Sequence, residues 1–207
     1  MSTRIIFVRH GVTELNDRGV IQGAAKTPLT ELGRRQAVAA ARALEVFSPT
    51  ALYSSPYVRA MQTAEIIGER LGLAVVESTR LREQGLSGWE GRVWQDIAAA
   101  DPPIAKRRDS EGWWFCPPGG EPRLRVRHRM LAFVGEMTER HNDETVIAVT
   151  HAGALYFLVH ALLDKIPIGR THIRTSNCGF SVVEADSERT RLVSLNEIAH
   201  LQKLEED

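Results

Sequence analysis

Two histidines in this chain each follow a run of apolar residues, and a glycine comes close behind each of them. Arg9-His10-Gly11 follows Ile5-Ile6-Phe7-Val8, and His151-Ala152-Gly153 follows Val146-Ile147-Ala148-Val149-Thr150. A neutral imidazole is a nucleophile near pH 7, and the forked guanidinium of Arg9 suits phosphate oxygens. Glycine lets the backbone turn tightly and lets a ligand approach it closely. Together these residue types indicate chemistry on a phosphate group without a metal ion.

The two apolar runs are predicted to be buried parallel strands, because they are continuous and rich in β-branched residues. In open α/β sheets, ligands bind beyond the carboxyl ends of such strands. We therefore expect His10 and His151 to face each other across one pocket. Each residue also has an ordinary alternative, since His10 could belong to a polar turn and His151 could be a packed histidine at a helix start.

A third segment predicts a helix whose start could bind an anion. Ser55 is a suitable N-cap and Pro56 a suitable first helical residue, which places Arg59 within about the first turn. A guanidinium beside the positive end of a helix suits an anion, although most arginines are simply solvated at the surface. The buried stripe predicted for this helix consists of Ala60, Ala64, Ile67 and Leu71.

The segment from Leu81 to Gly91 is predicted to be a loop, because it holds three glycines. Glu83 lies in this segment. A carboxyl group that loses contact with water can serve as a general acid. The alternative for Glu83 is an ordinary surface carboxylate.

These segments, in this order along the chain, resemble the histidine phosphatase superfamily in its phosphoglycerate mutase-like branch. The resemblance extends from near the start to beyond residue 150, and the tail shares it. The residues that carry it are Arg9-His10-Gly11 with Thr13 and Asn16, Gln22-Gly23, Pro28-Leu29-Thr30 with Gly33 and Gln36-Ala37, Ser54-Ser55-Pro56, Arg59-Ala60, Gln62-Thr63-Ala64, Leu81, Glu83, Gly88-Trp89-Glu90-Gly91, Pro118-Gly119-Gly120-Glu121, Thr150-His151-Ala152-Gly153, Asn177, Leu195-Asn196 and His200.

The resemblance implies a division of roles. His10 would attack phosphorus and become phosphohistidine, and Glu83 would protonate the leaving oxygen and then help to activate water. His151 is expected to be protonated, and the second ring nitrogen of His10 should donate to a carbonyl of the Gly11 region. No metal and no cofactor are expected. The residues assigned to phosphate binding are Arg9, Asn16, Gln22, Arg59, His151 and Ala152, of which Asn16 and Gln22 could instead be ordinary turn residues.

Bulk properties narrow the function classes. The 207 residues suffice for one domain with a sizeable core. The 26 basic and 26 acidic side chains give no positive field for nucleic acid, and no apolar run is long enough to span a membrane. The N-terminus is expected to enter the first strand directly, without a signal peptide. The only cysteines, Cys116 and Cys178, lack metal-ligand spacing, so a reducing cytoplasm is the expected location.

Alternating strands and helices predict an α/β fold, a three-layer α/β/α sandwich with a mostly parallel sheet. A closing hairpin around Asp186-Ser187-Glu188 adds one antiparallel strand, which the resemblance also implies. Predicted helices cover Thr30 to Phe47 and Arg123 to His141. Their apolar faces are predicted to consist of Ala37, Ala40, Ala41 and Leu44 in the first helix, and of Val126, Met130, Phe133, Val134 and Met137 in the second. Predicted strands cover Arg4 to Val8, Ala51 to Ser54, Leu73 to Glu77, Thr145 to Val149, Phe180 to Ala185 and Arg191 to Leu195.

Residues 1–207 are expected to form a single domain, with a lid or specificity insertion at about residues 94–121, because long irregular segments near a site are often lids. Trp113 and Trp114 could contact substrate, but at least one is expected in the core. Lys106-Arg107-Arg108 is expected to be solvated. Arg170 and His172 near a predicted loop, and His200 in the tail, are left without an assigned role.

Three functions fit these residues. A metal-independent phosphatase acting on a small phosphorylated metabolite is favoured, because the Gly88-Trp89-Glu90-Gly91 pattern resembles the phosphatase branch. A phosphoglycerate mutase is the alternative, and Gly85, where many relatives carry a larger residue, leaves the substrate open. A binding protein without activity is disfavoured, since His10 and Glu83 are both present. A homodimer is compatible with the sequence but is not specified by it.

Overall fold

The computed structural model describes residues 2–168 and 173–204, so the predicted loop residues Arg170 and His172 lie outside the described part. The strands are β1 (Thr3–Arg9), β2 (Ala51–Ser54), β3 (Val75–Glu77), β4 (Thr145–Thr150), β5 (Phe180–Ala185) and β6 (Thr190–Glu197). The α-helices are α1 (Glu14–Asp17), α2 (Glu31–Leu44), α3 (Val58–Leu71), α4 (Trp94–Ala100), α5 (Pro102–Ser110), α6 (Arg123–Arg140) and α7 (Ala152–Leu162). Short 3₁₀ turns cover Glu45–Phe47, Thr79–Leu81, Ser87–Trp89, Gly112–Trp114 and Ala199–Leu204.

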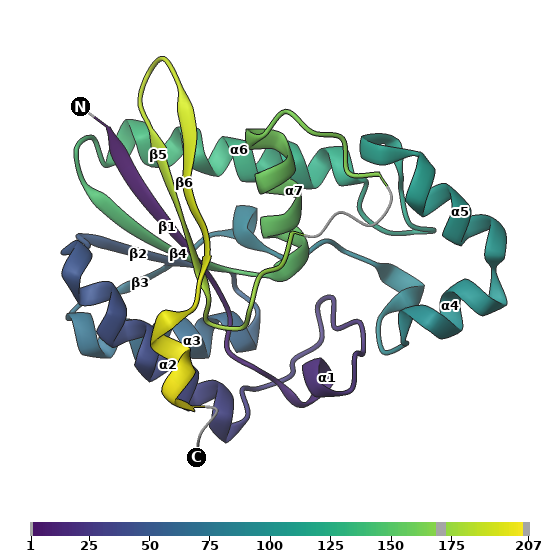
Figure 1. The fold of residues 1–207 in the computed structure, drawn as a ribbon, viewed down its shortest axis with the longest axis horizontal. Coiled ribbons are helices and arrows are strands. Elements are labelled where there is room, and N and C mark those ends of the chain that lie inside the picture. The colour runs from purple at the N-terminus through teal and green to yellow at the C-terminus, as the bar shows by residue number, and fades with distance from the viewer. Residues whose placement is uncertain (1, 169–172, 205–207) are drawn as a thin grey trace.

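The six strands form one sheet in the order β3-β2-β4-β1-β5-β6 (Figure 1). The pairs β2–β3, β2–β4 and β1–β4 are parallel. Both partners of β5 are antiparallel to it, so β5 alone runs against the other five strands. This confirms the predicted mostly parallel sheet with one antiparallel strand.

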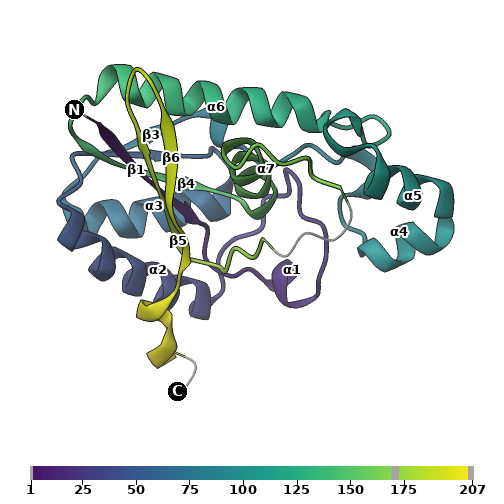
Figure 2. The ribbon, with the colours of Figure 1, turned by 45° about the horizontal axis from the view of Figure 1, so that its top comes forward.

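Helices cover both faces of the sheet and complete the three predicted layers. Figure 2 shows α6 on one side of the sheet and α2 and α3 on the other. Side chains alternate along β1, so that Ile5 and Phe7 join the core with α6 and α7, while Ile6 and Val8 join the core with α2 and α3. The continuous apolar runs read from the sequence are explained by this burial on both faces. Within the described residues, no helix is long and apolar enough to cross a membrane.

The helical stripes predicted for α2 and α6 are confirmed. All of the predicted α6 residues from Val126 to Met137 are buried, and so are those of α2. The end of α2 differs, because its last predicted residues, Glu45–Phe47, form a 3₁₀ turn that closes on a left-handed Ser48. The strand expected from Leu73 begins at Val75, because the left-handed Gly72 ends α3 and Leu73 still donates to the carbonyl of Gly68.

The predicted start of α3 is wrong. The helix begins at Val58 with Tyr57 as its N-cap, and Ser55 lies outside it. The hydroxyl of Ser55 is 2.7 Å from Nε2 of His151, a partner from a distant part of the chain. Arg59 nevertheless falls in the first turn of the helix, as predicted.

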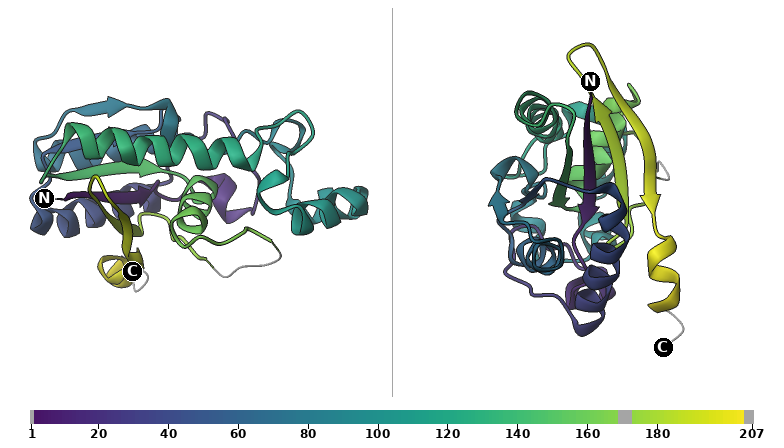
Figure 3. Two further views of the ribbon diagram at one scale, coloured as in Figure 1. Left: turned by 90° about the horizontal axis from the view of Figure 1, so that it is seen from above. Right: turned by 90° about the vertical axis from the view of Figure 1, so that its left-hand side faces the viewer.

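The segment at residues 94–121 is more regular than expected. It contains α4 and α5, and Figure 3 shows them beyond the end of the sheet. Asp101 separates the two helices and accepts the N–H of Ile104 at 3.0 Å, and Pro102 occupies the first turn of α5. An Asp N-cap followed by proline is a strong helix-start signal. Trp113 packs against the core, whereas Trp114 is 79% exposed. The lid role of this segment stays a prediction.

Candidate active site

The carboxyl ends of β1 and β4 bring His10 and His151 together. The two strands are neighbours, and Arg9 pairs with Thr150 at their ends. His10 extends this pairing by donating its backbone N–H to the carbonyl of Thr150 at 3.0 Å. The two imidazole centroids are 5.2 Å apart. The expected juxtaposition of the two histidines is therefore confirmed.

The ring of His10 is held in one tautomer. Its Nδ1 lies 2.8 Å from the carbonyl of Gly11 and must donate to it, as predicted. Nε2 is the second ring nitrogen, and it accepts an N–H from Arg59 at 3.2 Å. Burial lowers the pKa of His10 well below its ordinary value, and the charges of Arg59 and Arg9 lower it further. The imidazole is therefore neutral, with its lone pair on Nε2.

Two guanidinium groups line the pocket that contains His10, and neither has a carboxylate partner among the described residues. Arg59 is 1% exposed and donates to the carbonyls of Gly23 and Ala25 at 2.8 and 3.2 Å. Arg9 donates to the carbonyl of Thr175 at 2.6 Å. Burial lowers the pKa of both groups, but arginine remains charged near neutral pH. Because backbone carbonyls do not neutralise them, these charges are available to an anion.

The unliganded protein favours a neutral His151, and the protonation expected for phosphate binding stays a prediction. His151 is fully buried, and that burial, together with the charge of Arg59, lowers its pKa well below the ordinary value. One ring nitrogen, Nε2, bonds to the hydroxyl of Ser55. Nδ1 is buried and has no partner among the described residues. A neutral imidazole results, because a charge there would face the arginines without solvent.

Glu83 reaches the same pocket from the loop before α4. Its Oε2 accepts the N–H of Gly153 at 2.9 Å, in the first turn of α7, and its Oε1 accepts the N–H of Gln84 at 2.8 Å. A helix N-terminus is a favourable place for a carboxylate. Both oxygens are thereby held by backbone donors.

Asn16, Gln22 and Ala152 line the pocket as well, whereas the fully buried His151 lies behind its lining residues and is not one of them. Asn16 caps the short helix α1 with Thr13, and its carbonyl oxygen accepts from Thr13 and from Asn177. Gln22 is 7% exposed, and its Oε1 has no partner among the described residues. His200 is elsewhere, where it bonds to the carbonyl of Cys178. The pocket has a volume of about 220 Å³, and its lining includes Arg9, His10, Asn16, Gln22, Arg59, Glu83 and Ala152.

Three supports of the site were not assigned a role from the sequence, although each belongs to a matching motif. Asn177 donates to the carbonyl of His10 at 2.9 Å. Thr63 accepts the N–H of Gly11 at 3.0 Å. Glu121 accepts the N–H of Gly85 and forms an ion pair with Arg129 at 3.0 Å. The motif positions could have pointed to them, but their partners lie far away in the sequence.

The described residues include no group of three or more His, Cys, Asp or Glu side chains arranged to hold a metal ion. The combination that the structure does present is a neutral, tautomerically fixed imidazole, two guanidinium groups and a carboxyl group around one small pocket. Such an arrangement can bind a phosphate dianion, attack phosphorus and exchange a proton with an ester oxygen.

Comparisons with known proteins agree with this geometry. A family model described as the histidine phosphatase superfamily (branch 1) matches residues 5–198. Glucosyl-3-phosphoglycerate phosphatase of Mycolicibacterium vanbaalenii is 39% identical over 168 residues, 77% of this chain and 74% of the relative. Metal-independent phosphoserine phosphatase of Arabidopsis thaliana is 30% identical over 209 residues, covering 98% and 84% of the two chains.

A probable phosphoglycerate mutase of Yersinia enterocolitica is 32% identical over 183 residues, 87% of this chain and 84% of the relative. Among solved structures, a mycobacterial glucosyl-3-phosphoglycerate phosphatase in complex with VO3 superimposes with a TM-score of 0.82 at 35% identity. That match covers 94% of this chain and 98% of the other. The resemblance inferred from the motifs is therefore confirmed over most of the chain.

Proposed function

The chain belongs to the histidine phosphatase superfamily, branch 1, and we propose that it is a metal-independent phosphatase that hydrolyses small phosphomonoesters. The observation that carries the proposal is the fixed tautomer of His10, whose unprotonated Nε2 lies beside the guanidinium of Arg59. The names of the relatives from Mycolicibacterium and Arabidopsis support the same reaction class.

In the first step, the phosphate group occupies the pocket between Arg9 and Arg59, and Nε2 of His10 attacks phosphorus. The bond between phosphorus and the ester oxygen breaks, and that oxygen takes a proton from Glu83. Phosphoryl transfer depends mainly on positioning and on stabilisation of charge. The two guanidinium groups supply positive charge, and the hydrogen bond from Nδ1 to Gly11 stabilises the ring as it donates its lone pair.

In the second step, water attacks phosphorus of the phosphohistidine and Glu83 accepts its proton. The bond between phosphorus and Nε2 then breaks, which releases inorganic phosphate and restores the neutral imidazole. A covalent intermediate divides one difficult displacement into two easier ones. We expect His151 to gain a proton only when the phosphate dianion is bound, because the dianion offsets the positive charges that keep it neutral.

The proposal is tested by phosphate release from a panel of phosphomonoesters in EDTA, with the wild type and His10→Ala. His128→Ala is the matched control, because His128 is exposed on α6. We expect EDTA-resistant release in the wild type and in the control, and none in His10→Ala. An acid-labile phosphoryl group trapped on the wild type and absent from His10→Ala identifies the nucleophile. Unchanged release by His10→Ala would overturn the assignment.

The mutase alternative is measured in the same preparation. 3-Phosphoglycerate is supplied with 2,3-bisphosphoglycerate, and isomerisation is compared with phosphate release. Isomerisation far faster than release would replace the phosphatase with a mutase, whereas neither activity would favour a binding role. The cytoplasmic location and a homodimer stay predictions of the sequence.

A further inference from the structure

A second pocket adjoins the phosphate pocket and has a volume of about 370 Å³. We call it the side pocket. Volumes of this size suit small-molecule ligands. The two cavities share Ile21, Gln84, Leu86, Ala152 and Gly153 in their linings, so a molecule held by its phosphate could extend from one into the other.

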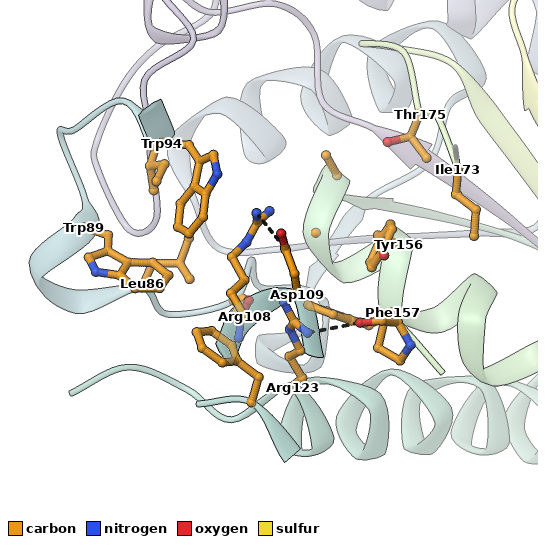
Figure 4. Close-up of a pocket in the computed structure, with 16 residues that line it drawn as sticks. Leu86, Trp89, Trp94, Arg108, Asp109, Arg123, Tyr156, Phe157, Ile173 and Thr175 are labelled. Carbon is orange, nitrogen blue, oxygen red and sulfur yellow. Dashed lines mark hydrogen bonds and ion pairs between the residues drawn. The ribbon is translucent and has the colours of Figure 1, made fainter. Parts of the chain in front are cut away.

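The walls of the side pocket are mostly apolar and aromatic. Figure 4 shows Leu86 and Trp94 on one side and Tyr156 on the other, with Arg108 and Asp109 between them. Phe157, on α7, adds a further ring to the lining. Apolar and aromatic lining residues favour a flat or cyclic group, because ring contacts add to the burial of apolar area.

Two guanidinium groups line the same cavity. The Cζ atom of Arg108 lies 3.9 Å from the centroid of the Trp94 ring, a cation–π contact. An exposed pair links Arg108 to Asp109 at 3.6 Å. Arg123 is 7% exposed and donates to the carbonyls of Gly112 and Pro167, but it has no carboxylate partner among the described residues. Buried charges in proteins are usually paired.

The described residues that line the side pocket carry more positive than negative charge. Among them, Arg108 and Arg123 contribute two positive charges and Asp109 one negative charge. Burial and the nearby Arg108 lower the pKa of Arg123 to about 10, so the two guanidinium groups repel each other in the unliganded protein. An anionic group of charge −1 would relieve that repulsion, and a carboxylate matches it better than a phosphate dianion does.

We propose that the side pocket binds the leaving group of the substrate, and that this leaving group combines a ring with a carboxylate. The ring would lie against Leu86 and Tyr156, and the carboxylate would face Arg108, which covers the ring of Trp94, and Arg123. This inference rests on the proposed phosphatase function, since the phosphate pocket must hold the other end of the same molecule. It deepens that proposal by naming the class of alcohol that the reaction releases.

The test uses phosphate esters of primary alcohols, so that the leaving groups react similarly without the enzyme. Ethyl phosphate has neither feature, 3-(phosphonooxy)propanoate has the carboxylate, benzyl phosphate has the ring, and 3- and 4-(phosphonooxymethyl)benzoate have both. We expect kcat/KM to rise about tenfold for the ring and about tenfold or more for the carboxylate. The ring-carboxylate esters should be the best substrates.

Variants separate the two contributions. Relative to ethyl phosphate, Arg108→Gln should reduce the preference for the carboxylate and Tyr156→Leu the preference for the ring, because Tyr156 lines the side pocket opposite Trp94. Arg107→Gln is the matched control, because Arg107 is exposed and pairs with Glu111 on the same helix. Equal kcat/KM values of the wild type for all the esters would overturn the inference. A preference for the carboxylate esters that is unchanged in Arg108→Gln would overturn it as well.

A binding measurement keeps this test independent of turnover. 4-(Phosphonooxymethyl)benzoate and ethyl phosphate are titrated into His10→Ala by calorimetry. Tighter binding of the benzoate, lost in the double variant with Arg108→Gln, supports the side pocket. Equal affinities overturn it. Failure of the wild type to release phosphate from any ester would overturn the phosphatase function. Calorimetry tests binding in the side pocket separately, so the two failures can be distinguished.

Discussion

Gly153→Ala should separate activity from stability, because the new methyl group would displace Glu83. A Cβ at position 153 would lie 2.5 Å from Oε1 of Glu83, whereas ordinary contact begins at 3.4 Å. The carboxyl group must therefore move by about 0.9 Å, the difference between these two distances. It ends a flexible side chain, so the movement itself costs little folding free energy.

The expected loss of activity follows from this displacement. A misplacement of about 1 Å can cost about 10²-fold in rate, which corresponds to about 2.7 kcal/mol of transition-state stabilisation. We expect kcat/KM for phosphate release to fall by about that factor. The unfolding temperature should stay level or rise, because alanine is favoured over glycine in a helix.

Gly135→Ala provides the control for this prediction. Gly135 is an exposed residue of α6, and a Cβ there meets no atom within 4 Å. The substitution should add about 0.5–1 kcal/mol to the free energy of unfolding without changing kcat/KM. At about 2–4 °C per kcal/mol for a chain of this size, the unfolding temperature should rise by about 1–4 °C. Full activity in Gly153→Ala would refute the placement of Glu83 as the proton donor. An unfolded variant would refute the claim that displacing the carboxyl group of Glu83 costs little folding free energy.

Three further predictions concern stability, titration and the support of Glu83. Gly11→Ala should lower the free energy of unfolding by about 1–3 kcal/mol, because its Cβ would lie 2.5 Å from the backbone oxygen of Gly33. A free energy of unfolding in urea equal to that of Gly135→Ala would contradict this prediction. Below pH 6.5, the ordinary pKa of histidine, His10 and His151 bind protons in the unfolded chain but stay neutral in the folded protein, where burial lowers their pKa. The free energy of unfolding should therefore decrease as the pH is lowered below 6.5, by up to about 1.4 kcal/mol per pH unit for each of these residues. Urea unfolding at pH 7.5, 6.5 and 5.5 should give a shallower decline for His10→Gln than for the wild type, and equal slopes would show that His10 titrates normally. Arg129→Met should release Glu121 from the loop of Glu83 and lower kcat about tenfold with little change in KM, and a change in KM alone would instead indicate a role in binding.

The sequence was sufficient for the elements whose patterns are local. The continuous β-branched runs identified β1 and β4, because burial on both faces of a parallel sheet requires apolar residues throughout. The predicted apolar stripes of α2 and α6 were also correct, because one face of each helix packs against the sheet. Boundaries were less accurate at α3 and β3, where a tertiary contact of Ser55 and a left-handed Gly72 decide where each element begins or ends.

The residue types of the candidate site were also available from the sequence, because chemistry restricts which side chains can attack phosphorus or bind phosphate. His10, Arg59 and Glu83 come together as expected. What each can do was not available, because protonation depends on burial and on charges from distant segments. His151 was expected to be charged, yet it is neutral in the unliganded protein, since folding removes its water and places it beside Arg59.

The sequence by itself therefore determined the order of the strands and of the helices that cover the sheet, the family and the candidate reacting residues, since each depends on local pattern or on side-chain chemistry. Only the tertiary structure decided the tautomer of His10, the neutrality of His151 and the side pocket of Arg108 and Arg123. The physical reason is that desolvation and charge interactions arise between segments far apart in the chain. No local pattern encodes those distances.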